Sequence, residues 1–209
     1  MRAGQARLLD DLLPRVAVPA EGPLQPLTLF APPVRDVRVE IGFGGGEHLA
    51  REALANPDTG FIGCEPFVNG VAKLLAQIEQ HRLANARVHS GDAREVLSRL
   101  APASIDRVDL LYPDPWPKRR QRKRRFVSEE TLALIAACLK PGAVLRFASD
   151  IDDYTGWTLA HILRSGYFYW EAARPPDWRE PWPGWQSTRY EQKARREGRD
   201  SAYLTFRRV

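Results

Sequence analysis

The sequence predicts an α/β protein whose sheet is mostly parallel and ends in an antiparallel C-terminal edge. Between residues 37 and 148, short apolar runs alternate with longer segments of helical spacing. This alternation is typical of βα units that build a parallel sheet with helices on both faces. After Gly166 the pattern changes, because two strand-like runs flank a long loop rich in proline and tryptophan. We expect these two runs to pair antiparallel at the edge of the sheet.

Five short runs are predicted to be buried parallel strands, since they are apolar and rich in β-branched residues. They cover residues 37–41, 60–64, 86–89, 105–112 and 143–148. Two segments between them, residues 67–83 and 131–139, have the apolar spacing of helices, and Lys140-Pro141-Gly142 is a helix stop. The edge strands are expected at residues 167–171 and 202–206, on either side of the loop 174–186.

The composition excludes several classes of protein. The 209 residues are 44% hydrophobic and 27% charged, as in a globular chain with its own core. The longest apolar run, residues 132–139, is too short to span a bilayer, and Asp10 and Asp11 interrupt the apolar stretch near the N-terminus. Two distant cysteines, Cys64 and Cys138, form no CxxC pattern, and the four histidines have no metal-ligand spacing and are expected to be surface or packing residues. We therefore expect a cytoplasmic protein with no disulfide framework, no metal and no membrane partner.

Basic residues are concentrated in one segment. Lys118 to Arg125 holds seven basic residues out of eight, the exception being Gln121. The rest of the chain has 24 basic and 26 acidic residues, although the net charge is +5. A local basic patch favours a polyanionic partner that touches one site, with a solvated surface as the alternative interpretation.

A glycine-rich segment, Val39-Glu-Ile-Gly-Phe-Gly-Gly-Gly46, follows the first predicted strand and opens a helix. Glycines allow a tight turn and the close approach of a ligand to backbone N–H groups. The dinucleotide fingerprint needs a further glycine where this chain has Glu47, and Glu40 and Glu47 would oppose the charges of a pyrophosphate. A cationic or neutral ligand suits this loop better.

Acidic residues follow the next two predicted strands. Glu65 stands where an acid can accept both ribose hydroxyls of an adenosyl group, and Asp92 offers a carboxylate near an adenine amino group. An acid, a glycine loop and two further strand-end acids, in this order, form the general arrangement of S-adenosylmethionine binding. Glycine turns and strand-end acids also occur singly in other doubly wound proteins, so the ordered series carries the prediction.

The fourth predicted strand runs into Leu110-Leu-Tyr-Pro-Asp-Pro-Trp-Pro117, directly before the basic segment. Three prolines stiffen this turn and hold Asp114 and Trp116 in a fixed relation. A carboxylate here can hydrogen-bond the edge of a nucleobase, and an indole can stack on it. The basic segment would then hold phosphates beside the same pocket, at the carboxyl edge where ligands bind in open α/β sheets.

The segment Pro113-Asp-Pro-Trp-Pro-Lys-Arg-Arg-Gln-Arg-Lys-Arg-Arg125 closely resembles the signature of bacterial, single-chain tRNA (guanine-N7)-methyltransferases. The glycine loop, Ala148-Ser-Asp150 and the segment 188–198 are similar to that family too. The resemblance implies a Rossmann-like S-adenosylmethionine-dependent methyltransferase fold and methyl transfer from S-adenosylmethionine to N7 of a guanosine in the variable loop of tRNA. It implies tRNA as partner, with no obligatory protein partner. A single methyltransferase domain over residues 1–209 is expected, with a catalytic core (36–209) and an N-terminal arm (1–35) that has a short helix-like start and is otherwise irregular.

Carried over position by position, the resemblance implies three groups of site residues. Around the cofactor it places Glu40, Gly42, Gly44, Gly46, Glu65, Asp92 and Asp114, the last being also the catalytic residue. In contact with the target guanosine it places Lys118, Asp150, Thr188, Arg189, Tyr190 and Glu191. In contact with RNA it places Arg120, Gln121, Arg122, Lys123, Arg124 and Arg125. The chain departs from the family at Gln121-Arg122, Ala194 and Arg199, which concerns RNA binding rather than the reaction.

The chemistry leaves alternatives open. Guanine N7 has an exposed lone pair and no proton, so we favour an Asp114 that orients guanine and stabilises charge over one that acts as a general base. A nucleobase amino-methyltransferase is the second hypothesis, although its (D/N)PP(W/Y/F) motif needs a proline where this chain has Trp116. A non-catalytic RNA-binding protein on the same fold is the third, and the retention of every cofactor acid disfavours it.

Overall fold

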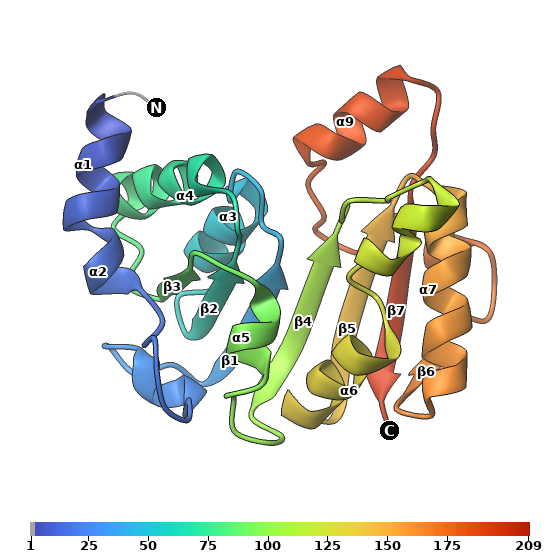
Figure 1. The fold of residues 1–209 in the computed structure, drawn as a ribbon, viewed down its shortest axis with the longest axis horizontal. Coiled ribbons are helices and arrows are strands. Elements are labelled where there is room, and N and C mark those ends of the chain that lie inside the picture. Colours follow the sequence, from blue (N-terminus) through green and yellow to red (C-terminus); the bar gives the residue numbers. More distant parts are fainter. Residues whose placement is uncertain (1–2) are drawn as a thin grey trace.

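A computed structural model describes residues 3–209 and shows one seven-stranded sheet with the strand order β3-β2-β1-β4-β5-β7-β6 (Figure 1). The strands are β1 (Asp36–Ile41), β2 (Thr59–Cys64), β3 (Ala86–His89), β4 (Ile105–Leu111), β5 (Leu139–Ser149), β6 (Phe168–Trp170) and β7 (Ala202–Arg208). Strands β1 to β5 pair in parallel, whereas β7 pairs antiparallel with both β5 and β6. The predicted fold class, a mostly parallel sheet with an antiparallel C-terminal edge, is confirmed.

Helices cover both faces of this sheet, each over its own apolar cluster. The helices α3 (Glu47–Ala55) and α4 (Val68–His81) share one cluster with Phe61 of β2. The helices α5 (Ala93–Leu97), α6 (Glu129–Cys138) and α7 (Asp152–Ser165) share the other with the neighbouring Ile62. Successive side chains of a strand point to opposite faces, so β2 contributes to both clusters and is buried along its whole length.

The N-terminal segment is more ordered than the irregular arm that the sequence suggests. It forms α1 (Ala3–Asp11), α2 (Leu13–Val16) and a 3₁₀ turn at Pro26–Leu29. The buried Leu8 belongs to the α3–α4 cluster, and Arg7 forms an ion pair of 2.7 Å with Glu79 of α4. Backbone pairing continues past α2, because the amide of Val18 donates to the carbonyl of Val88 in β3 (2.9 Å). Apolar packing on α4 therefore holds this segment against the sheet.

Two boundaries near the carboxyl half also differ from the predicted ones. Strand β5 begins at Leu139, directly after α6, because Leu139 pairs with Ile105 before the register shifts. The loop between β6 and β7 contains two helices, α8 (Pro176–Arg179) and α9 (Arg189–Arg196). Helix α9 lies above the carboxyl end of β4 (Figure 1). Trp185 and Tyr203 hold it there by hydrogen bonds to Glu191, and their rings pack edge to face with each other and with Trp182.

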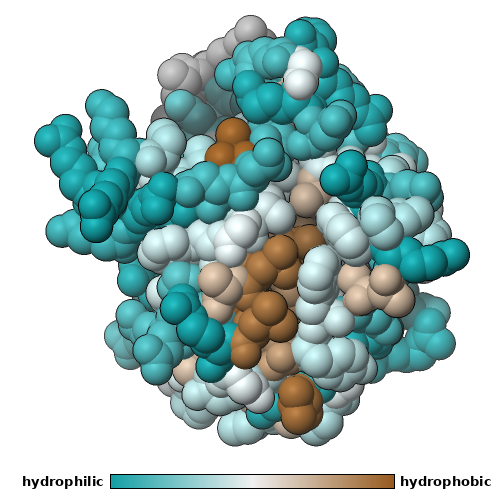
Figure 2. Space-filling model, turned by 90° about the vertical axis from the view of Figure 1, so that its right-hand side faces the viewer, coloured by the Kyte–Doolittle hydropathy of each residue, from teal (hydrophilic) through white to brown (hydrophobic). Residues whose placement is uncertain are grey.

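The side of the molecule formed by α7 and β6 carries an apolar band between polar flanks (Figure 2). On α7, Leu163 is 61% exposed. Along residues 3–209, no helix combines the length and apolar character that crossing a bilayer requires. Within the same range, no three His, Cys, Asp or Glu side chains lie where they could jointly hold a metal ion.

Candidate functional site

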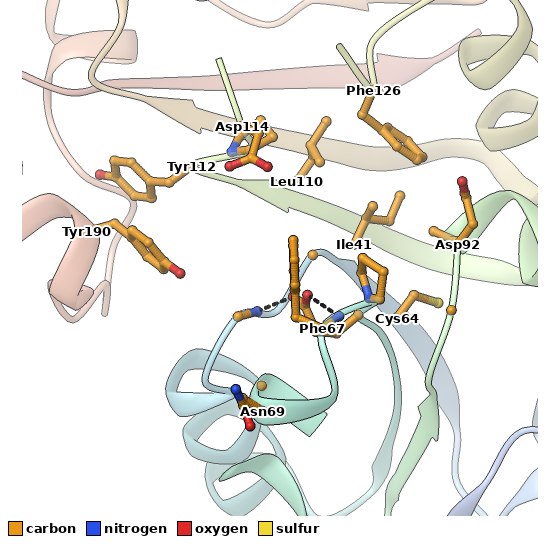
Figure 3. Close-up of a pocket in the computed structure, with 18 of the residues that line it drawn as sticks. Ile41, Cys64, Phe67, Asn69, Asp92, Leu110, Tyr112, Asp114, Phe126 and Tyr190 are labelled. Carbon is orange, nitrogen blue, oxygen red and sulfur yellow. Dashed lines mark hydrogen bonds between the residues drawn. The ribbon is translucent and has the colours of Figure 1, made fainter. Parts of the chain in front are cut away.

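A cavity of about 460 Å³ opens at the carboxyl ends of β1, β2 and β4. Strand β1 lies between β2 and β4, so the chain order of the sheet reverses here, which is where open α/β sheets bind ligands. Figure 3 shows the side chains around the cavity, with Asp114, Tyr112 and Tyr190 toward one end and Asp92 and Phe126 toward the other. The site residues thus come from strand ends, from the loop before α6 and from α9, which are far apart in sequence.

The glycine loop forms one wall of the cavity through Gly42 and Gly44. Gly44 has a φ of +58°, and a Cβ there would lie 3.0 Å from the hydroxyl of Tyr190. Gly46 is placed differently, because it precedes α3 with a φ of +76° and a Cβ there would lie 2.7 Å from Leu74. Two of the three predicted glycines therefore face the cavity, whereas the third permits close packing of α3 on α4.

The acid at the end of β2 is held rigidly against this loop. Glu65 is 4% exposed and lines the cavity. Its Oε2 accepts a hydrogen bond from the amide of Gly44 (2.8 Å), and its Oε1 accepts one from the amide of Phe67 (3.0 Å) (Figure 3). Each carboxylate oxygen has further acceptor capacity, so Glu65 can still receive the hydroxyls of a ribose.

Replacing Glu65 by alanine is expected to weaken S-adenosylmethionine binding by about 1–3 kcal/mol, the usual cost of losing a charged hydrogen-bond partner. Calorimetric titration of wild type and variant measures this difference. Glu79, exposed on α4 and outside the cavity, provides the matched Glu→Ala control. Wild-type affinity in the Glu65 variant would show that Glu65 does not hold the ribose. Tight NAD binding by the wild type, with no S-adenosylmethionine signal, would show that the cavity holds a different ligand.

Apolar rings and a second acid line the part of the cavity next to Glu65. Asp92 caps α5 and accepts hydrogen bonds from the backbone and guanidinium of Arg94, which hold the pKa of this carboxyl below its usual range. Phe67 is 69% exposed and lines the cavity together with Phe126. Sequence reasoning missed both phenylalanines, although Phe67, two positions after the strand-end acid Glu65, offers a ring that can stack on a base.

Glu40 does not line the cavity, in contrast to the expected contact with the cofactor. Its side chain is buried on the α3 face of β1, where Oε2 lies 2.7 Å from Nδ1 of His48. Burial raises the pKa of Glu40. Burial also opposes the charged form of His48, but the neighbouring carboxylates, Glu40 foremost, outweigh this and raise the pKa of His48. The ring of His48 also packs on Trp185, with centroids 5.2 Å apart. Glu40 is thus placed to anchor α3 and the Trp-rich loop.

The segment after β4 brings Asp114 to the cavity together with two aromatic rings. Tyr112 and Trp116 both have positive φ angles, of 50° and 42°, which turn the chain sharply on either side of Asp114. The hydroxyl of Tyr112 donates to Ser201 Oγ (2.9 Å), and the guanidinium of Arg124 lies 4.8 Å from the Trp116 ring. Asp114 itself is exposed to the cavity.

Helix α9 covers the glycine loop from the other side. Thr188 caps the helix by accepting a hydrogen bond from the amide of Glu191 (3.2 Å), and Arg189 and Tyr190 reach the cavity. Glu191 differs from its expected contact with guanosine because it is fully buried. Its carboxylate accepts hydrogen bonds from Trp185 Nε1 (2.7 Å) and Tyr203 (2.7 Å) and pairs with Arg195.

The remaining predicted contacts divide by exposure. Lys118, Arg120, Lys123 and Arg124 are exposed, and Gln121 is half-buried. Asp150 is paired with Arg199 at 2.7 Å, and Arg122 is paired with Asp153 at 2.7 Å. Arg125 differs from the other residues predicted to contact RNA, because its side chain is fully buried and cannot reach a phosphate at the surface.

Known proteins similar to this chain agree on its family. The model of a family described as putative methyltransferases matches residues 35–204. A tRNA (guanine-N(7)-)-methyltransferase of Nitrobacter hamburgensis is 57% identical over the whole chain, which spans 82% of that relative. Relatives with the same description from Bradyrhizobium diazoefficiens and Rhizobium meliloti are 56% and 55% identical over the whole chain, which spans 89% and 91% of them.

Solved structures support the fold. The crystal structure of the 16S rRNA methyltransferase KamB superposes with a TM-score of 0.60 at 21% identity, over 84% of this chain and 89% of that one. A 16S rRNA (adenine(1408)-N(1))-methyltransferase variant from Catenulisporales acidiphilia, solved with SAM, has a TM-score of 0.58 at 15% identity, over 84% and 86%. The resemblance seen in the sequence motifs is thereby confirmed, and the chain belongs to the tRNA (guanine-N(7)-)-methyltransferase family.

Proposed function

We propose that this chain transfers a methyl group from S-adenosylmethionine to N7 of a guanosine in the variable loop of tRNA. The observation that carries the proposal is one cavity lined both by Glu65, whose carboxylate is held against the glycine loop, and by the exposed carboxylate of Asp114. Relatives that are 55–57% identical over the whole chain are named tRNA (guanine-N(7)-)-methyltransferases, which supports tRNA as the substrate and guanine N7 as the methylated atom. The match over residues 35–204 supports a single methyltransferase domain, which we expect to act in the cytoplasm.

The residues around the cavity fit S-adenosylmethionine. Glu65 would accept the ribose hydroxyls, Asp92 would accept from the adenine amino group, and Phe67 would cover the base. The carboxylates of Glu65 and Glu47 lie next to Gly44 and Gly45, and their negative charges disfavour the pyrophosphate of a dinucleotide. When bound, S-adenosylmethionine supplies a methyl group that its positively charged sulfur makes electrophilic.

The work left to the protein is orientation and charge stabilisation. Guanine N7 needs no deprotonation, so Asp114 serves by accepting hydrogen bonds from the N–H groups on the opposite edge of guanine and by offsetting the positive charge that develops on the ring. Tyr190 and Trp116 flank the same end of the cavity and can hold the base between apolar surfaces. The base is expected to be extruded from the folded RNA to reach this depth.

Cations on both rims of the cavity would hold the RNA backbone. The 3₁₀ helix Arg119–Arg124 lies on one rim, and the exposed Lys193 and Arg196 of α9 lie on the other. Such contacts position the RNA without reading its sequence. The choice of base is left to the groups inside the cavity.

Neutralising three exposed cations of the basic segment, Arg119, Arg120 and Lys123, to glutamine is expected to weaken tRNA binding most at low salt. Removing one cation that binds a phosphate should flatten the slope of log affinity against log salt by about 0.7–0.9 of a unit. Titrations at several salt concentrations measure the slope. The control neutralises three cations away from the carboxyl ends of the strands: Arg35 directly before β1, Lys140 at the start of β5, and Arg164 in the last turn of α7. Equal slopes for both triple variants would make the basic segment an ordinary solvated surface.

The proposal is tested by incubating the protein with unmodified tRNA and methyl-labelled S-adenosylmethionine, followed by digestion to nucleosides. Label that co-migrates with 7-methylguanosine is the expected result. Label in an N-methylated adenosine or cytidine would support an amino-methyltransferase instead, and unlabelled tRNA that is nonetheless bound tightly would support a non-catalytic RNA-binding protein.

A further inference from the structure

We infer that Arg125, the last residue of the basic segment, is a positioning residue for the Asp114 loop rather than a contact for RNA phosphate. Its side chain has 0% exposure, although it follows directly on the exposed Lys123 and Arg124. A guanidinium without access to solvent cannot meet a backbone phosphate. Its charge and its five N–H donors must therefore be satisfied inside the protein.

The contacts of Arg125 lead directly to the proposed catalytic loop. Its Nε donates a hydrogen bond to the carbonyl oxygen of Pro115 (2.8 Å), between the two cavity residues Asp114 and Trp116. This bond fixes the peptide between Pro115 and Trp116, one residue after Asp114. Trp116 has a left-handed backbone conformation, which costs free energy and persists only where the surroundings hold it.

The other end of the guanidinium is fixed to α7. One terminal nitrogen pairs with the carboxylate of Asp153, and the other donates to the backbone carbonyl of the same residue (3.4 Å). The guanidinium also lies against the rings of Tyr154 (4.8 Å) and Trp157 (5.1 Å). Planar stacking combined with a forked set of donors suits arginine and not lysine.

Helix α7 is itself locked to the chain that follows Arg125. The hydroxyl of Tyr154 accepts a hydrogen bond from the amide of Phe126 (3.1 Å), and Trp157 Nε1 donates to the carbonyl of Val127 (2.8 Å). Arg125 thus joins the Asp114 loop to a rigid helix. The proposal rests on the proposed function of this site, because the loop matters to catalysis only through Asp114.

Arg125→Gln and Arg120→Gln form the test pair, since both remove one charge from the same segment. For Arg125→Gln we expect kcat at saturating tRNA to fall on the order of 10-fold to 100-fold, as small misplacements of a catalytic group do, while the salt slope of tRNA binding stays at the wild-type value. For Arg120→Gln we expect the slope to flatten by about 0.7–0.9 of a unit and KM for tRNA to rise. A slope lowered equally in both variants, with kcat retained in Arg125→Gln, would overturn the inference.

Arg125→Lys and Asp153→Asn keep the test decisive if Arg125→Gln does not fold. Arg125→Lys retains the charge, so a phosphate contact predicts wild-type behaviour whereas a positioning role predicts a lower kcat. Asp153 is 47% exposed, so Asp153→Asn should fold, which calorimetric binding of S-adenosylmethionine verifies. Removing the carboxylate of Asp153 leaves Arg122 and Arg125 without their ion-pair partner. If only electrostatics matter, tRNA should bind more tightly and kcat should stay unchanged. If Arg125 positions the Asp114 loop, kcat should fall.

The wild type, assayed in parallel for 7-methylguanosine, separates this inference from the proposed function. Failure of the wild type to methylate tRNA would refute the function. The salt slopes of the two Arg→Gln variants would still decide whether Arg125 touches phosphate.

Discussion

Replacing Asp114 by alanine is expected to lower kcat for tRNA methylation by about 10²–10³-fold, the usual effect of removing one preorganised electrostatic contact to a transition state. Affinity for tRNA should change little, because the exposed cations on the rims supply most of it. Single-turnover kinetics with enzyme in saturating excess over tRNA, together with equilibrium tRNA binding, separate the two effects.

Asp114→Asn is the matched variant, because it keeps the shape of the side chain and removes its charge. If Asp114 accepts hydrogen bonds from guanine N–H groups and offsets positive charge, the asparagine variant should be faster than the alanine variant but slower than the wild type. The amide oxygen of asparagine can accept one hydrogen bond, whereas its NH₂ group would face a guanine N–H donor. A wild-type rate in the alanine variant would mean that Asp114 has been assigned wrongly. A rate that follows the ionisation of a group with a pKa near neutrality would favour general-base catalysis.

Replacing Glu191 by alanine is expected to destabilise the fold rather than only the chemistry. The carboxylate is fully buried, and its loss leaves Trp185 Nε1 and the Tyr203 hydroxyl without their acceptor. Breaking a buried charged network typically costs about 3–5 kcal/mol. In a chain of this length that corresponds to a fall in Tm on the order of 10 °C, measured by calorimetry.

Glu197→Ala on the end of the same helix is the control, since that carboxylate is 43% exposed and should contribute within about 0.5 kcal/mol. A Tm in Glu191→Ala equal to that of the control would contradict the anchoring role. Loss of tRNA methylation at an unchanged Tm would instead favour the direct contact with guanosine that the family resemblance implies.

The fold could be predicted because its main strands are buried on both faces and read as continuous apolar runs. The predicted runs at 37–41, 60–64 and 86–89 lie within one residue of β1, β2 and β3. Helix α9 could not be predicted in this way, because Glu191 and Ala194 are its buried residues and the other six residues, four of them cations, are exposed. Its position depends on Trp185 and Tyr203, which lie outside the segment.

The positions of the site residues that directly follow strands could be predicted from the sequence. Glu65, Asp92 and Asp114 each follow a strand, and parallel strands bring their carboxyl ends to one edge, so all three line the cavity. The burial of Glu40 and Arg125 was not predictable, because it depends on partners from other elements. Glu40 is paired with His48 of α3, and Arg125 with Asp153 of α7.

The most direct test of the account compares two tRNAs that differ in one atom of the target guanosine. One carries guanosine in the variable loop, and the other carries 7-deazaguanosine at that position, which keeps the Watson–Crick edge for Asp114 but has no N7. With labelled S-adenosylmethionine, we expect the first tRNA to be methylated and to be cleaved at that position after borohydride and aniline treatment. The second should bind with the same affinity and remain unlabelled. Equal incorporation of label into both tRNAs would contradict methyl transfer to N7.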